Sequence, residues 1–215
     1  MVLTMDETVE NEFLDRALAL MAKKELDAAE LELDAGLKDA EAKKDKVLTA
    51  LFYSTLGVLY KMKKDFSKSW KFYEKAEKTL PEDSSLKLIS ARLLIDVFGQ
   101  FDAAIHRCQR VIQASKSDPT MAHQAYGTMG LAYLRKAEKS QTVDCLENAM
   151  REDFAGISTA ANIDLKLLEA MIRKKVGLEA CKSYLERALK FAEAKQEENF
   201  AELFRRLLEA FPKDE

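Results

Sequence analysis

Two histidines and three cysteines are the residues of this 215-residue chain that could most readily support catalysis or bind a metal. His106 and His123 do not lie in a metal-ligand spacing such as H-E-x-x-H. The sequence also lacks the glycine-rich phosphate loops and the G-x-S-x-G nucleophile string. Because 33% of the residues are charged, a pair of carboxylates is no sign of acid–base chemistry. The sequence therefore predicts a protein that is not an enzyme, with no metal and no cofactor.

The cysteines lie about 36 residues apart and form no C-x-x-C pair: Cys108, Cys145 and Cys181. An odd number of cysteines without a secretion signal indicates reduced, buried thiols in a cytoplasmic protein. No apolar run approaches the ~18 residues of a membrane span. The acidic N-terminal residues, MVLTMDETVENEF, do not resemble a signal peptide. We interpret His123 as a solvated or helix-capping residue.

The charge pattern gives little support to nucleic-acid binding. The net charge is −3 and the pI is about 5.7, so no overall field attracts a polyanion. Residues 1–50 carry 13 acidic and 7 basic side chains, whereas residues 61–78 carry 7 lysines and 3 acids. The first interpretation is solvated helix faces of opposite sign. A docking site for an acidic partner remains the alternative.

Good helix formers dominate the chain, and the 7 glycines and 3 prolines are too few for the turns of an all-β fold. Gly57 nevertheless lies inside a strongly helical run, where glycine costs about 1 kcal/mol relative to alanine. One helical face of this run carries Tyr53, Leu56, Gly57 and Tyr60, and the following helix carries Phe66, Ser69, Tyr73 and Ala76 before Pro81 ends it. The small residues Gly57 and Ser69 predict a close approach of the two helices.

This pattern resembles the tetratricopeptide repeat, a helix–turn–helix unit of ~34 residues. A second copy of the first-helix signature is YGTMGLAYL, residues 126–134. Aligned on these copies, repeats start near residues 10, 50, 85, 123 and 162, and Arg92 takes the glycine position of the third. The resemblance implies an all-α, right-handed solenoid of about five repeats over residues 1–192. Residues 193–215 then supply a capping helix and tail, which an array needs to cover its last face.

Candidate N-cap residues occur at the predicted starts of several helices. Asp118 with Pro119 is expected to start one helix, as N-cap and first helical residue. Asp83 or Ser84 would cap the third repeat, and Ser158 or Thr159 the fifth. Asn199 with Glu202 is similar to a capping box and would start the final helix.

In the tetratricopeptide family, outward positions of the first helices line a concave groove that binds protein segments. Carried over to this chain, the partner-binding positions are Ser54, Val58, Lys61, Leu86, Ile89, Leu93, Asp96, Gln124, Gly127, Leu131, Arg135, Lys166, Ala170 and Arg173. The family's carboxylate clamp is absent, because Leu14, Leu18, Ser54 and Val58 occupy its positions. The groove is predicted to have an apolar floor and a basic C-terminal end. The predicted floor residues are Val58, Leu93 and Leu131, and those of the basic end are Arg135, Lys166, Arg173 and Lys174.

The predicted function is that of a scaffold or adaptor that binds a peptide or amphipathic helix of another protein, with an acidic flank on that ligand. Two other functions remain open. One is a chaperone that holds a secreted or assembling client, and the other is a structural module that forms a homo-oligomer. It also remains open that the groove residues pack inside the protein, against the N-terminal segment or a second copy.

Overall fold

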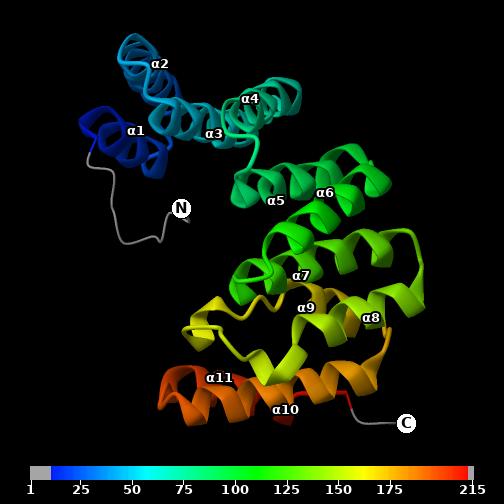
Figure 1. Cartoon of the computed structure of the whole chain (residues 1–215). Coiled ribbons are helices and arrows are strands. Elements are labelled where there is room, and N and C mark those ends of the chain that lie inside the picture. The colour runs from blue at the N-terminus through cyan, green and yellow to red at the C-terminus, as the bar shows by residue number, and fades with distance from the viewer. Residues whose placement is uncertain (1–10, 213–215) are drawn as a thin grey trace. The chain divides into compact units, whose positions relative to one another are not determined.

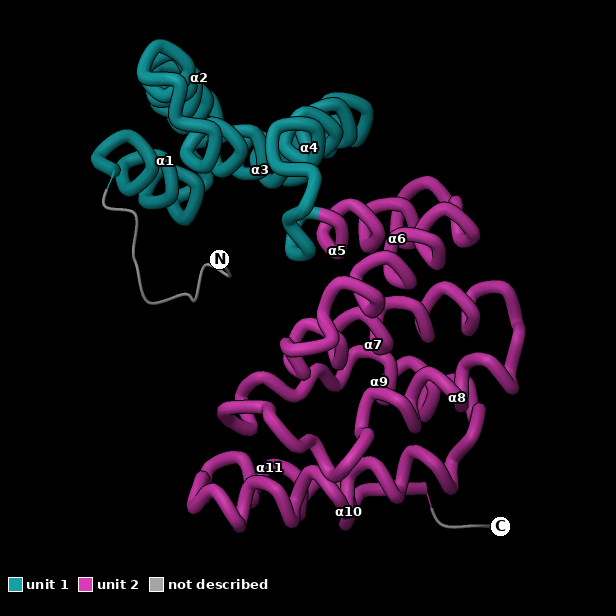
Figure 2. Tube along the Cα trace, in the orientation of Figure 1, with its two compact units in different colours: residues 1–86 teal, residues 87–215 magenta. Residues whose placement is uncertain are grey.

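The computed structural model describes residues 11–212 and contains eleven α-helices and no strand within them. Residues 1–10 and 213–215, which include most of the N-terminal stretch and the end of the predicted tail, lie outside the described residues. The chain divides into two compact units, residues 1–86 (unit 1) and residues 87–215 (unit 2) (Figure 2). The helices are α1 (Glu12–Ala22), α2 (Leu26–Ala42), α3 (Lys46–Met62), α4 (Phe66–Thr79), α5 (Ser84–Leu93), α6 (Phe101–Ala114), α7 (Pro119–Arg135), α8 (Lys139–Ala149), α9 (Lys166–Arg173), α10 (Leu178–Ala194) and α11 (Glu198–Glu209) (Figure 1).

Several consecutive helices pack as hairpins, and the most extensive contact is the one between α3 and α4. A β-carbon added to Gly57 would lie 2.7 Å from the Tyr73 ring. The Ser69 hydroxyl, fully buried, donates a hydrogen bond of 2.8 Å to the Gly57 carbonyl oxygen. The two small residues therefore allow α3 and α4 to meet closely, which offsets the helix propensity that Gly57 gives up.

Unit 1 repeats one turn every 20 residues. After α1, α2 and α3 the chain reverses at Lys24, Lys44 and Lys64, whose φ angles are 63°, 56° and 62°. At each turn the next residue donates its N–H to a carbonyl five residues earlier, as Asp65 does to Tyr60 (2.9 Å). This bond is typical of the Schellman motif, which usually uses glycine at the left-handed position. These turns direct the helices of unit 1 around a core that includes Leu33, Phe52, Leu56 and Leu59.

Unit 2 contains a π-helical turn, Leu94–Phe98, between α5 and α6. The closing bond runs from Gln100 N–H to the Leu94 oxygen, which is one residue wider than the turns of unit 1. The extra residue corrects the predicted register of the third repeat. Ala91, fully buried, is the small residue of α5, and Arg92 points outward.

A second irregular segment of unit 2 joins α8 to α9. Glu152, Asp153 and Phe154 all have positive φ angles, between 51° and 63°, which is costly for side chains with a β-carbon. The turn carries Phe154 into the interior, where only 1% of it is exposed. Its ring packs against Tyr184 at 5.2 Å and Phe191 at 6.0 Å, both on α10. This aromatic packing compensates for the strained backbone.

The predicted caps have mixed outcomes. Asp118 accepts from Met121 N–H with Pro119 at the first helical position, and Asp83 accepts from Leu86 N–H, so both predictions are confirmed. The capping box at Asn199 is wrong, because α11 begins one residue earlier, at Glu198. The fifth-repeat caps are also wrong, since a 3₁₀ turn and a loop separate Thr159 from α9. Residues 185–204 form two helices, and α11 packs along α10.

Candidate functional site: the first-helix faces

The outward face of α3 in unit 1 is an apolar surface. Val47, Val58 and Met62 are 40–41% exposed, and Leu51 between them is half-buried. We call these four residues the α3 stripe. Lys61, one of the predicted site residues, is exposed beside it. Ser54, also predicted, lies between Leu51 and Val58, and its hydroxyl donates 3.0 Å to the helix's own Leu51 oxygen. The stripe therefore offers apolar contact with few polar groups.

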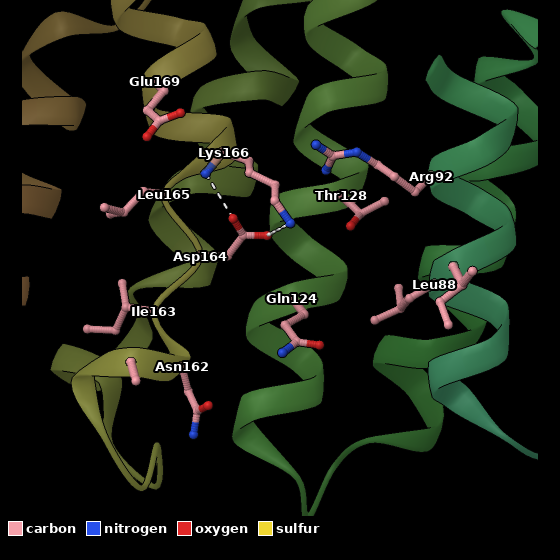
Figure 3. Close-up of a pocket in the computed structure, with 12 residues that line it drawn as sticks. Leu88, Arg92, Gln124, Thr128, Asn162, Ile163, Asp164, Leu165, Lys166 and Glu169 are labelled. Atoms are coloured by element: carbon pink, nitrogen blue, oxygen red, sulfur yellow. Dashed lines mark hydrogen bonds and ion pairs between the residues drawn. The ribbon is translucent and has the colours of Figure 1, made fainter. Parts of the chain in front are cut away.

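Unit 2 contains a pocket of about 590 Å³ between first helices. Leu88, Ile89 and Arg92 of α5 form one wall and Gln124 and Thr128 of α7 form the floor. The opposite wall is the loop before α9 and the start of that helix, with Ala161, Asn162, Ile163, Asp164, Leu165, Lys166 and Glu169. Figure 3 shows Leu88 and Arg92 pointing from α5 toward α7, with Asp164 and Lys166 facing them from the other side.

Three charged side chains of the pocket, Arg92, Asp164 and Lys166, form ion pairs within their own segment of the chain. The Arg92 Nε donates to Asp96 at 3.2 Å. The Lys166 ammonium lies 3.9 Å from the Asp164 carboxylate, which also accepts the Lys166 backbone N–H at 2.8 Å. These salt bridges are partly exposed and therefore weak. A charged group of a ligand can therefore replace one partner of either salt bridge. The side-chain amides of Gln124 and Asn162 can form hydrogen bonds with a peptide backbone.

His123 holds the loop wall of the pocket in place through hydrogen bonds. It is 97% removed from solvent, since only 3% of it is exposed, which corrects the expectation of a solvated or capping residue. Its Nε2 accepts the Asp164 backbone N–H at 2.8 Å. The neutral ring therefore carries its proton on Nδ1, which donates to the Ala149 oxygen at 2.7 Å. Burial lowers the pKa of His123, and the Ala149 bond and the Asp164 carboxylate oppose this effect.

Two further bonds hold the same loop. The Tyr184 hydroxyl donates to the Asp164 carbonyl oxygen at 3.0 Å. The Ala160 N–H donates to the Glu197 carboxylate at 2.9 Å. The loop backbone is thus bonded to α7, α10 and the residue before α11. This arrangement gives the pocket a fixed wall, although the loop itself has no α-helix.

The structure brings three of the predicted site residues together in the pocket: Ile89, Gln124 and Lys166. Ile89 is 40% exposed and the other two are half-buried or exposed. Two of the predicted floor residues, Leu93 at 1% and Leu131 at 9% exposure, lie in the interior. Leu86 and Gly127 are buried too, Ala170 is half-buried, and Asp96, Arg135 and Arg173 are exposed outside the pocket.

The pocket residues that the sequence did not suggest have identifiable reasons. The repeat alignment predicts a core position for Arg92, because the sequence does not reveal that the π-helical turn shifts α5 by one residue. Thr128 lies one helical turn after Gln124, so the spacing of four residues indicates that both lie on the same helix face. Asp164 and Leu165 lie in a loop, and helical periodicity predicts nothing about the positions of loop residues.

The remaining reactive groups have structural roles. Burial raises the pKa of Cys108 and Cys145 to about 12 and that of Cys181 to about 11, so all three thiols stay protonated. All three are free and buried, as expected. No cluster of three or more potential metal ligands occurs among residues 11–212. Over the same residues no helix has the length and apolarity to cross a membrane.

Comparisons with known proteins identify the fold. No family model and no curated protein matches the sequence. Among solved structures, the apo form of RapI aligns with a TM-score of 0.64 at 16% identity, over 94% of this chain and 77% of its own. PilF from Pseudomonas aeruginosa aligns with 0.58 at 13% identity, over 94% and 91%. PilW, a type IV pilus biogenesis factor, aligns with 0.58 at 14% identity, over 96% and 97%. The chain therefore has the tetratricopeptide-like helical repeat fold.

Proposed function

We propose that this tetratricopeptide-like chain is a non-enzymatic adaptor that binds a segment of another protein on its first-helix faces. The observation that carries the proposal is the pocket of unit 2, which combines apolar walls with amide and charged groups. Apolar side chains such as Leu88 and Ile89 can bury a ligand side chain. Gln124 and Asn162 can each donate to and accept from a peptide backbone. This combination suits an extended or helical peptide.

The α3 stripe supports the same function in unit 1 with a different chemistry. Three aliphatic side chains there are about 40% exposed on one helix face. Burying such groups against an apolar ligand face is favourable by about 25 cal/mol per Å². An amphipathic helix is the ligand that matches the stripe best, since its apolar side chains also recur every three or four residues.

A second candidate function is a chaperone for an aggregation-prone client, and the α3 stripe is the observation that favours it. Such a protein would hold an apolar segment of its client without a defined polar contact. Light scattering of the client with and without the chain separates the two functions, because an adaptor leaves its partner's solubility unchanged. In either case the three reduced thiols suit a cytoplasmic location.

The test begins with affinity capture from native lysate and quantitative mass spectrometry, followed by titration of a synthetic peptide from each captured protein. We expect Ile89→Glu or Val58→Glu to weaken peptide binding at least tenfold, because each places a charge in an apolar contact. Leu203→Glu on α11 is the matched control, since Leu203 is equally exposed at 41% but belongs neither to the α3 stripe nor to the pocket lining. Circular dichroism verifies that all three variants are folded. If the first two variants bind like the control, the first-helix faces are not the binding surface.

A further inference from the structure

Helix α2 carries a row of acids on its outward face. Asp27, Asp34 and Glu41 are all exposed and seven residues apart, which is about two helical turns. We call them the α2 acidic stripe. The opposite face of α2 is the buried one, with Ala29, Leu33, Gly36 and Ala40. In total α2 contains six acids and one lysine, so its surface is strongly negative.

A row of lysines with the same spacing lies on α4 and the turn before it. Lys64, Lys71 and Lys78 are exposed and also seven residues apart, and they form the α4 lysine stripe. Lys68 and Lys75 lie between them. Their ammonium groups are positioned by aromatic rings, at 4.8 Å from the Tyr60 ring and 5.2 Å from the Tyr53 ring. The face of α4 that is buried carries Ser69, Tyr73 and Ala76.

Two acids of the α2 acidic stripe have partners in unit 1. Asp27 pairs with Lys63 at 2.6 Å, and Glu41 accepts a hydrogen bond from the Tyr53 hydroxyl at 2.7 Å. Among residues 11–212, the three lysines of the α4 lysine stripe form no ion pair. Asp34 forms no ion pair with these residues either. Burial and the nearby Glu30 carboxylate raise the pKa of Asp34, whereas the Lys38 ammonium lowers it. Beside it, Leu31 is 73% exposed, the highest value of any large apolar side chain described. Unpaired charge and exposed apolar surface thus coincide on α2.

We propose that the α2 acidic stripe of one copy of this chain packs against the α4 lysine stripe of a second copy. Both stripes belong to unit 1, so a twofold axis forms the contact twice. Asp34 meets Lys71 at the centre of each contact, and neither residue forms an ion pair with another of residues 11–212. Leu31 is covered at the same time.

A second copy fits these observations better than other anionic partners. A nucleic acid on the α4 lysine stripe would be repelled by the acids of α2 in the same unit. An unrelated acidic peptide would neutralise α4 but leave the α2 acidic stripe and Leu31 exposed. The stripes lie on second helices, whereas the α3 stripe and the pocket use first helices, so the pairing is independent of the proposed adaptor function.

The first measurement is the molar mass by light scattering over a range of protein concentrations. We expect a species of twice 24.4 kDa at low ionic strength, about 20 mM salt. At about 500 mM salt the dissociation constant should rise at least tenfold, because salt screens exposed charges. A monomer at every concentration in low salt would overturn the proposal. A monomer that binds poly-glutamate through Lys71 would do so as well, since the lysines would then serve a foreign partner.

The decisive experiment exchanges the central charges. Asp34→Lys alone and Lys71→Glu alone should each weaken self-association at least tenfold, because like charges then meet twice in each dimer. Mixing the two variants should restore the dimer, since both contacts of the mixed pair are complementary again. Glu186→Lys and Lys116→Glu, exposed positions in unit 2, are the matched controls and should leave the mass unchanged. If the mixture stays monomeric, or if each variant alone still forms dimers, the proposed pairing is wrong.

Discussion

Unit 1 and unit 2 present their first helices in different ways. In unit 1 the turns repeat every 20 residues at Lys24, Lys44 and Lys64, and α3 displays a smooth apolar stripe. In unit 2 a π-helical turn and a strained loop interrupt the pattern, and a pocket with both apolar and polar side chains lies beside them. Regular repeats thus give an apolar face, whereas the irregular segments add the groups that can recognise a ligand.

The largest effect is expected from removing the ring that holds the strained loop of unit 2. Phe154→Ala should lower the free energy of unfolding by about 3–5 kcal/mol, because it leaves a cavity and removes the compensation for three residues with positive φ. Urea denaturation measures the loss, and hydrogen exchange should increase over residues 155–165. Leu203→Ala, at an exposed position, should cost much less. A loss below about 1 kcal/mol for Phe154→Ala would show that the loop is held by other contacts.

The next effect concerns the histidine under the pocket wall. His123→Ala should cost about 1–3 kcal/mol, because the Asp164 N–H and the Ala149 oxygen lose a buried partner. His106→Ala, at an exposed position, is the control and should be nearly neutral. Equal stability of the two variants would contradict the role given to His123.

The same residue predicts a pH dependence. The pKa of His123 is lower in the folded chain than its value of 6.5 in the unfolded one, so the unfolded state binds the proton more readily. His123 therefore contributes its full stability above pH 6.5, and this contribution is lost as the pH falls through its folded pKa. The free energy of unfolding of the wild type should fall more steeply below pH 6.5 than that of His123→Ala. Parallel curves for the two proteins would exclude this linkage.

A pair of glycine variants compares helix packing in the two units directly. A β-carbon at Gly57 would meet the buried Tyr73 ring at 2.7 Å, whereas one at Gly127 would have nothing within 4 Å. Gly57→Ala should destabilise by about 1–2 kcal/mol, because overpacking exceeds the gain in helix propensity. Gly127→Ala should stabilise by about 0.5–1 kcal/mol. Thermal unfolding gives both values, and a change of the same sign in both would contradict the comparison.

The smallest effect belongs to the regular turns of unit 1. Lys44→Gly should stabilise the chain by about 0.5–1 kcal/mol, because glycine adopts the φ of 56° without strain. Lys43→Gly is the control, since Lys43 has an ordinary φ of −77° and gains nothing. If both variants are equally stable in urea, the left-handed lysines carry no strain.

Most of the fold was predictable because helical periodicity and turn residues are local signals. Gly57 with Ser69, the cap at Asp118 and the buried cysteines all follow from such patterns. The site was less predictable, because a single extra residue in the π-helical turn exchanges Ala91 for Arg92 at the buried position. The loop wall depends on His123 and Tyr184, which reach Asp164 across 41 and 20 residues of sequence. Contacts of that length leave no local pattern.

The π-helical turn also changes the direction in which one helix face points without changing how the next helix begins. One additional residue inside a helix rotates the part before it by about 100° about its own axis relative to the part after it. Here the rotation brings Arg92 to the pocket, while α6 still begins after a left-handed turn residue, Gly99, as α4 begins after Lys64. A repeat protein of this kind can therefore acquire a new binding surface on one helix through a one-residue insertion, without rebuilding the repeats that follow.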